Sequence, residues 1–210
     1  LLEIANRDPQ KLAASDLGFA LGPRLNAAGR LDDMSVGVAL LLCDNIGEAR
    51  VLANELDALN QTRKEIEQGM QAEALTLCQQ LERSADTLPG GLAMYHPQWH
   101  QGVVGILASR IKERFHRPVI AFAPTGDGTL KGSGRSIQGL HMRDALERLD
   151  MLNPGLMMKF GGHAMAAGLS LREEELPAFR AAFAAYAGAH LSEEDYEPKV
   201  SVEFEMMPEE

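Results

Sequence analysis

The sequence predicts an α/β fold: a mixed sheet of about four to five strands flanked by helices, preceded by a long interdomain helix and a small helical segment. Three observations predict it. Residues 48–83 contain no proline and one glycine, and their apolar residues recur at helical spacing. Residues 118–123 form a near-continuous apolar run, which is typical of a central strand covered on both faces. Shorter strand-like and helix-like segments follow, so helices should cover the sheet.

Residues 46–83 are expected to form one long connecting helix. At about 1.5 Å per residue it would extend on the order of 55 Å, more than a small domain needs, so it should bridge two domains. Its middle, residues 60–65, is polar nearly all round, which predicts that the helix crosses solvent between two packing surfaces. A self-associating coiled coil is the alternative, although the apolar heptads are irregular.

Shorter elements are predicted on both sides of this helix. Residues 18–23 carry loop signals, and the apolar residues 34–43 indicate a short buried helix. After a turn at 89–91 the predicted order is strand 92–95, helix 103–115, strand 118–123, a strand near 131–136, helix 141–149, strand 165–171 and helix 173–187. The acidic residues 192–197 are expected to be a linker, and the alternating residues 199–204 predict a further strand.

Charge is distributed unevenly along the chain. The 210 residues carry a formal net charge of −10, yet residues 99–169 hold nine Lys and Arg against five Asp and Glu. This central segment is locally basic and can attract phosphates, although the acidic remainder argues against a general nucleic-acid coat. No apolar run of about 18 residues and no leader are present, so we expect a cytoplasmic protein. Cys43 and Cys78 lack metal-ligand spacing and are expected to be reduced thiols.

The first polar motif is Lys131-Gly-Ser-Gly-Arg-Ser136, on or just after a strand. Ser133 and Arg135 are two residues apart, so an extended chain presents them on one face. A hydroxyl, a guanidinium and backbone amides left uncovered by glycine together suit a phosphate. A glycine-kinked strand with a solvated arginine is the alternative.

The second motif is Gly161-Gly162-His163. Paired glycines allow positive φ and close approach, and they should place His163 at the lip of a turn, where it could donate to a phosphate, stack on a base or bind a metal. A purely structural histidine is the alternative. Gln101 precedes helix 103–115, whose N-terminus favours an anion or a nucleic-acid backbone. Trp99 is expected in the core or at a boundary rather than stacked on a base.

These motifs together resemble the DHH-associated domain of the Asp-His-His phosphoesterase superfamily: Gly-Ser-Gly-Arg-Ser, then His141-x-x-Asp144, then Gly-Gly-His followed by Ala-Ala-Gly. Two further blocks, residues 22–30 (GPRLNAAGR) and 99–106 (WHQGVVGI), narrow the resemblance to the family of RecJ-type exonucleases. The resemblance covers almost the whole chain.

The resemblance also implies what this chain lacks. The superfamily is named after an Asp-His-His triplet that helps to hold catalytic Mn²⁺ or Mg²⁺, and the sequence contains no such triplet. It therefore implies no catalytic residue and no metal ligand in this chain, with the metal bound by ligands outside it. The implied organisation is a helical remnant of the catalytic domain (1–45), the connecting helix (46–83), the DHH-associated substrate-binding domain (84–190), and a linker with the first strand of a following domain (191–210).

The implied function is the substrate-binding part of a metal-dependent 5′-to-3′ exonuclease that hydrolyses single-stranded DNA in recombination and repair. This chain alone is expected to be inactive. Single-stranded DNA is the expected partner, and a single-strand-binding protein is a candidate. The alternatives are an oligoribonuclease or cyclic-dinucleotide phosphodiesterase of the same superfamily, and a non-catalytic nucleic-acid-binding module. The resemblance implies DNA or phosphate contacts, with the choice between the first two left open, at Arg24, Arg30, Gln101, Ser133, Arg135, Gly161, Gly162 and His163.

Overall fold

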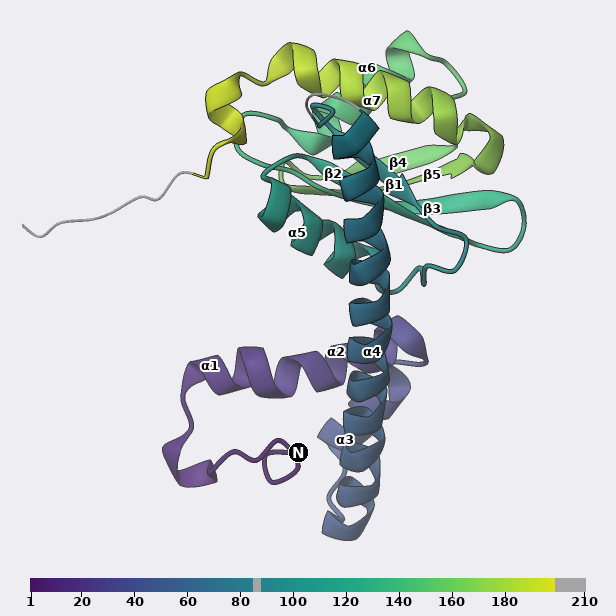
Figure 1. Cartoon of the computed structure of the whole chain (residues 1–210). Helices are drawn as coiled ribbons and strands as arrows, with labels where there is room; N and C mark the ends of the chain where they lie inside the picture. Colours follow the sequence, from purple (N-terminus) through teal and green to yellow (C-terminus); the bar gives the residue numbers. More distant parts are fainter. Residues whose placement is uncertain (85–87, 199–210) are drawn as a thin grey trace, which may run out of the picture.

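The computed structural model describes residues 1–84 and 88–198, in which one long helix joins a group of short helices to an α/β domain (Figure 1). The N-terminal group contains the 3₁₀ turn η1 (Pro9–Lys11), α1 (Ala14–Asp16), the π-helical turn η2 (Leu17–Leu21), α2 (Gly22–Leu31) and α3 (Ser35–Leu42). The loop predicted over residues 18–23 is wrong, because these residues are helical. Pro23 lies in the first turn of α2, where its missing N–H costs no hydrogen bond.

The helix predicted over residues 34–43 is confirmed as α3, but its predicted burial is wrong. Leu41 and Leu42 are 69% and 76% exposed, and Val38 is 49% exposed. The segment is apolar nearly all round, so it leaves apolar surface uncovered whichever face it packs on α4. Burial depends on which elements surround a helix, and its own composition does not report them.

The long helix is confirmed as α4 (Ile46–Ser84), whose 39 residues extend about 58 Å. One stripe of it is buried from end to end, formed by Ala53, Leu56, Asn60, Glu67, Met70, Ala74 and Cys78. The first part of the stripe packs on α2, and the last part packs on α5 (Val104–Phe115) and the sheet. Spacings of three, four or seven residues keep the stripe on one face.

The middle of α4 is exposed at Gln61, Thr62, Lys64 and Glu65, as the prediction for residues 60–65 requires, but it is not solvated all round. Asn60 and Glu67 are buried, and Arg63 joins them by donating to Asn60 Oδ1 at 2.8 Å and pairing with Glu67. Arg110 of α5 also donates to Glu67 Oε1, at 3.3 Å. One face of this polar segment is therefore buried, and its polar groups satisfy each other there.

The sheet has five strands: β1 (Leu92–Tyr95), β2 (Val119–Pro124), β3 (Thr129–Arg135), β4 (Lys159–Gly162) and β5 (Ala166–Arg172). Their spatial order is β1-β2-β3-β5-β4. The β1–β2 pair is parallel and the other three pairs are antiparallel, so the predicted mixed sheet is confirmed. Strands β1 and β4 form its two edges.

Helices cover the two faces of the sheet unequally (Figure 1). On one face α5 (Val104–Phe115) and the end of α4 pack on β1 to β3, and Trp99 lies in this core as expected. On the other face α6 (Met142–Leu152) and α7 (Leu176–His190) enclose a second core around Phe122 and Phe179, whose ring centroids are 5.4 Å apart. His141 caps α6 by accepting from the Asp144 N–H at 3.2 Å.

Two short 3₁₀ turns complete the described chain, η3 (Glu173–Glu175) before α7 and η4 (Glu193–Tyr196) after it. The acidic linker predicted over 192–197 is therefore partly helical, and the Arg117 guanidinium lies 4.1 Å from the centre of the Tyr196 ring. The strand predicted over 199–204 lies outside the described residues. None of the helices within 1–84 and 88–198 is both long and apolar enough to span a bilayer.

Candidate nucleic-acid interface

Strand β3 presents Ser133 and Arg135 on one face, as the spacing predicts. The Arg135 Nη1 donates to Ser133 Oγ at 3.1 Å and to the Gly134 carbonyl at 2.8 Å. The idea that glycine leaves bare amides here is wrong, because β3 pairs with β2 on one side and β5 on the other. Its glycines serve packing instead: a Cβ on Gly132 would lie 2.5 Å from the Phe122 ring.

The first turn of α5 lies against these two side chains. A Cβ on Gly105 would come within 3.0 Å of both Ser133 Oγ and Arg135 Nη2, so only glycine lets the helix approach so closely. A Cβ on Gly102 would lie 2.0 Å from the carbonyl oxygen of Arg30, and Arg30 Nη1 donates to the Gly102 carbonyl at 3.3 Å. The end of α2, the start of α5 and the end of β3 therefore meet at one place.

Two guanidinium groups share this junction without a counter-ion. Burial of Arg135, and next the positive charge of Arg30, lower the pKa of the Arg135 guanidinium. Among the described residues, no carboxylate lies within ion-pair distance of either arginine. Two neighbouring cations, the Ser133 hydroxyl and a helix N-terminus make a place that favours an anion. We call Arg30, Ser133, Arg135 and the first turn of α5 the arginine junction.

Arg24 lies outside this junction. Its Nε pairs with Asp57 Oδ1 of α4 at 2.7 Å, and its Nη1 donates to the Ala20 carbonyl at 2.7 Å. Its side chain is only 15% exposed, so these two partners occupy most of it. Of the two arginines that the sequence could not separate, Arg30 is the one beside Arg135.

Gln101 lies next to the arginine junction in sequence and in space, and His163 lies further away across the sheet. Gln101 is exposed in the turn that leads into α5. His163 directly follows β4, is exposed, and donates its backbone N–H to the Ala166 carbonyl at 2.8 Å. Since Ala166 pairs with Arg135, the His163 backbone lies two strands from Arg135, about 10 Å away.

His163 lies at the start of the turn formed by residues 163–165, as predicted, and the two glycines before it end strand β4, which sequence analysis did not predict. Gly162 has φ +149°, and a Cβ there would lie 2.4 Å from Ala167 Cα, so the backbone requires glycine. Gly161 has nothing within 4 Å of an added Cβ, so the fold makes no such demand there.

A basic hollow that sequence analysis missed extends from the junction along α2. It has a volume of about 330 Å³ and lies between α2, α4 and α5, lined by Phe19, Pro23, Arg24, Asn26, Arg30, Asn60, Arg63, Lys64, Ile106 and Arg110. Five of these side chains are cationic. They come from three helices far apart in sequence, and a local pattern carries no signal for that convergence.

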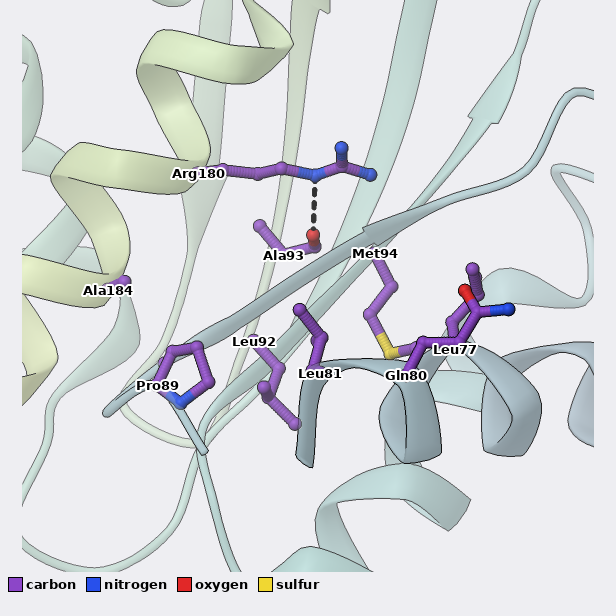
Figure 2. Close-up of a pocket in the computed structure, with 10 residues that line it drawn as sticks. Leu77, Gln80, Leu81, Pro89, Leu92, Ala93, Met94, Arg180 and Ala184 are labelled. Atoms are coloured by element: carbon purple, nitrogen blue, oxygen red, sulfur yellow. Dashed lines mark hydrogen bonds between the residues drawn. The ribbon is translucent and has the colours of Figure 1, made fainter. Parts of the chain in front are cut away.

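Another hollow, of about 430 Å³, is apolar and lies elsewhere. It is formed at the free edge of β1 by the last turns of α4, residues 89–94 and α7 (Figure 2). Figure 2 shows Arg180 reaching over it to the Ala93 carbonyl, to which its Nε donates at 2.9 Å. Strand β2 separates β1 from β3, so this hollow is not part of the arginine junction.

The described residues offer no cluster of three or more His, Cys, Asp or Glu side chains that could hold a metal ion. The chemistry available at the junction is thus that of binding: charge, hydrogen-bond donors and a helix N-terminus.

Comparison with known proteins settles the family. Residues 89–189 match the DHHA1 domain family. The chain is 88% identical, over 183 residues and 87% of its length, to the single-stranded-DNA-specific exonuclease RecJ of Escherichia coli (strain K12). The chain belongs to the RecJ family. It is also 35% identical over 206 residues, 97% of this chain and 25% of the relative, to RecJ of Bacillus subtilis (strain 168), so the predicted resemblance is confirmed.

RecJ structures support the same conclusion. The crystal structure of RecJ from Thermus thermophilus in complex with Mg²⁺ aligns with a TM-score of 0.74 at 34% identity, over 90% of this chain and 27% of that one. The same RecJ has been solved in complex with Mn²⁺. The present chain spans about a third of the E. coli relative's length, 32%. It contains the DHHA1 domain together with the long helix and the helices before it.

Proposed function

We propose that this chain is the substrate-binding part of a metal-dependent 5′-to-3′ exonuclease acting on single-stranded DNA in recombination and repair. The observation that carries the proposal is the arginine junction, where two guanidinium groups lie together without a carboxylate among the described residues. A DNA phosphate supplies the missing negative charge and accepts from a guanidinium in bidentate fashion. The relatives named RecJ are single-stranded-DNA-specific exonucleases, which supports DNA as the ligand.

Each residue of the junction has a role in this proposal. Arg135, fixed by Ser133, holds a phosphate at or near the 5′ end of the strand, and Arg30 closes the site from α2. Gln101 and the start of α5 add hydrogen-bond donors. His163, at the end of β4, contacts a neighbouring phosphate, next to the backbone of Gly161 and Gly162. Arg24 braces α2 against α4 through Asp57 and does not contact DNA.

The metal ions belong to the part of the enzyme that faces this junction. Mn²⁺ or Mg²⁺ would be bound by ligands outside this chain and would activate water for attack on phosphorus. The exposed apolar residues of α3 and the start of α4, including Leu41, Leu42 and Ile46, give that part a surface to pack on. We expect the intact protein to act in the cytoplasm, with a single-strand-binding protein as a candidate partner.

The alternatives differ from this proposal in substrate. An oligoribonuclease or a cyclic-dinucleotide phosphodiesterase would prefer di- and trinucleotides to long DNA, and a comparison of cleavage rates on the two substrate classes separates them. A non-catalytic binding module would bind DNA and cleave neither. Of the five cations that line the hollow, Arg24, Arg63 and Arg110 are paired with Asp57 or Glu67. Lys64 has no carboxylate of the described residues within ion-pair distance, so it adds a further positive charge beside Arg30 for a strand longer than a dinucleotide.

The decisive experiment measures fluorescence anisotropy of metal-free, full-length protein with 5′-phosphorylated and 5′-hydroxyl single strands across a salt titration. Arg135→Gln should weaken binding of the phosphorylated strand more than of the hydroxyl strand. It should also flatten the dependence of log K on log salt by about 0.7 for each phosphate that the variant no longer neutralises. Arg148→Gln, an exposed arginine on α6 across the sheet, is the matched control. Unchanged binding by the Arg135 variant would refute the proposal, and equal weakening on both strands would place Arg135 further along the DNA.

A further inference from the structure

We infer that the DNA strand continues from the arginine junction across the open face of β3, β5 and β4, where Lys131 and Lys159 hold further phosphates above a floor of bare glycine backbone. This inference rests on the proposed function and names the next part of the same binding track. Strand register, open space and charge all indicate that the occupant is a single strand of nucleic acid.

The register places the residues of this floor in rows across the sheet. Ser170 of β5 pairs with Lys131 of β3 on one side and with Lys159 of β4 on the other. Residues directly opposite each other in a sheet point to the same face, so these three form one row. The next row toward Arg135 is Ser133, Gly168 and Gly161. Both rows lie on the face that carries Ser133 and Arg135.

This part of the face is open. Helix α5 packs on β2 and β3, whereas Lys131, Lys159, Gly161 and Gly168 are exposed. A hollow of about 280 Å³ lies here, with both lysines at its rim and the backbone of Gly132, Gly161 and Gly168 in its lining. Three of the eight residues that line it are glycines, so uncovered peptide backbone forms part of its surface.

The fold does not explain glycine at two of these positions. A Cβ on Gly161 would meet nothing within 4 Å, and one on Gly168 would meet only the Gly132 carbonyl oxygen at 3.9 Å. Neither has a positive φ. By contrast, Gly132 and Gly162 would clash with the core or the backbone. Glycine weakens a strand, and where packing does not require it, it often marks the close approach of a ligand.

The charges select an anionic occupant with several phosphates. No Asp or Glu lines the hollow, and no carboxylate of the described chain lies within ion-pair distance of Lys131 or Lys159. Lys131 is four residues along β3 from Arg135, about 13 Å, and Lys159 is two strands from Lys131, about 10 Å. One phosphate cannot span these separations, whereas an oligonucleotide backbone can. The floor offers no side chain that would distinguish bases, so the contact is independent of sequence.

The test uses full-length, metal-free protein and two 5′-phosphorylated thymidine probes, a dinucleotide and an octanucleotide. The double variant Lys131→Gln/Lys159→Gln should bind the octanucleotide about tenfold more weakly and lower its salt slope by about 1.4, since two phosphates are no longer neutralised. Its affinity for the dinucleotide should not change, because that probe ends within the arginine junction. Arg135→Gln should weaken both probes.

A second pair of variants tests the glycine floor. Gly161→Val and Gly168→Val should melt at or above the wild-type temperature, because an added Cβ meets nothing closer than 3.9 Å and valine favours a strand. Both should weaken binding of the octanucleotide, because the valine side chain occupies the floor. Gly69→Ala on α4, where space is equally open, should change neither affinity.

If the Lys131→Gln/Lys159→Gln variant binds the octanucleotide as tightly as wild type while Arg135→Gln binds it more weakly, this inference is overturned and the proposed function stands. Wild-type binding by Arg135→Gln as well would overturn both. A lower melting temperature of the full-length valine variants, with octanucleotide affinity retained, would show that protein rather than DNA covers this face and would also overturn the inference.

Discussion

Gly102→Ala should separate α2 from α5 and weaken the arginine junction. The added Cβ would lie 2.0 Å from the Arg30 carbonyl oxygen, whereas real Cβ contacts are essentially never shorter than 3.0 Å. The two backbones must therefore move apart by about 1 Å. Overpacking of this kind costs about 1–3 kcal/mol, and the obstacle here is a backbone carbonyl rather than a side chain that can rotate away.

Thermal unfolding measures this cost. For a chain of about 200 residues, 1 kcal/mol shifts the melting temperature by about 2–4 °C, so Gly102→Ala should melt about 2–12 °C below wild type. Gly69→Ala is the matched control, because its Cβ meets nothing within 4 Å in the middle of α4. Alanine is the better helix former there by about 0.5–1 kcal/mol, so this variant should melt higher.

Gly102→Ala should also bind DNA less well, because the separation of the two backbones moves Arg30 away from Arg135. Affinity for a 5′-phosphorylated strand, measured well below both melting temperatures, should fall for Gly102→Ala and stay at the wild-type value for Gly69→Ala. A Gly102→Ala protein that melts at or above the wild-type temperature would refute the packing argument. Normal stability with impaired binding would refute the link through backbone separation.

Three further predictions concern other parts of the chain. Hydrogen bonds from Thr125 and Thr129 lower the pKa of Asp127 to about 2. Its carboxylate therefore stabilises the β2–β3 turn fully at pH values above the ordinary pKa of 3.8, and this stabilisation is lost as the pH falls through about 2. An NMR titration of Asp127 with a midpoint near pH 3.8 would contradict this. Burial raises the pKa of Cys78 to about 11, so iodoacetamide at pH 8 should alkylate Cys43 before Cys78. Mass spectrometry follows the order of alkylation, and modification of Cys78 first would contradict the prediction. Phe179→Ala should cost about 3–5 kcal/mol, because the ring is fully buried, and chemical denaturation giving less than 1 kcal/mol would contradict it.

The sequence predicts the α/β class, the long helix and four of the five strands, because these depend on local periodicity. It misses β4 (Lys159–Gly162), a short strand that ends in two glycines. It also places Ser133 and Arg135 together, since alternation along one strand is a local rule. It cannot choose between Arg24 and Arg30, because that choice depends on Asp57, which lies 33 positions from Arg24 and captures it. Distance in sequence also hides the approach of Arg110 to Glu67, which lies 43 positions away, whereas the Arg63–Glu67 pair is local.

Polarity alone is an incomplete guide to exposure. The middle of α4 is solvated on one face only, and α3 is exposed where its apolar composition predicted burial. Asn60 and Glu67 are buried with partners, while Leu41 and Leu42 are exposed. The type of a side chain makes burial more or less favourable, and the elements packed around it determine whether it is buried. The position of Lys131 beside Ser133 could have been predicted from the sequence, since it lies two positions before Ser133 on the same face of the strand.

Because α4 is one unbroken helix, its length and the orientation of the domain that follows it cannot change independently. Each residue added to its middle would lengthen it by about 1.5 Å and turn everything beyond by about 100°. An insertion of one residue would rotate the DHHA1 domain away from Arg30, whereas seven residues restore the angle to within about 20° but move the halves about 10 Å apart. Neither change preserves both quantities. The position of Arg30 relative to Arg135 is therefore set by the number of residues in α4, which a substitution leaves unchanged and an insertion or deletion does not.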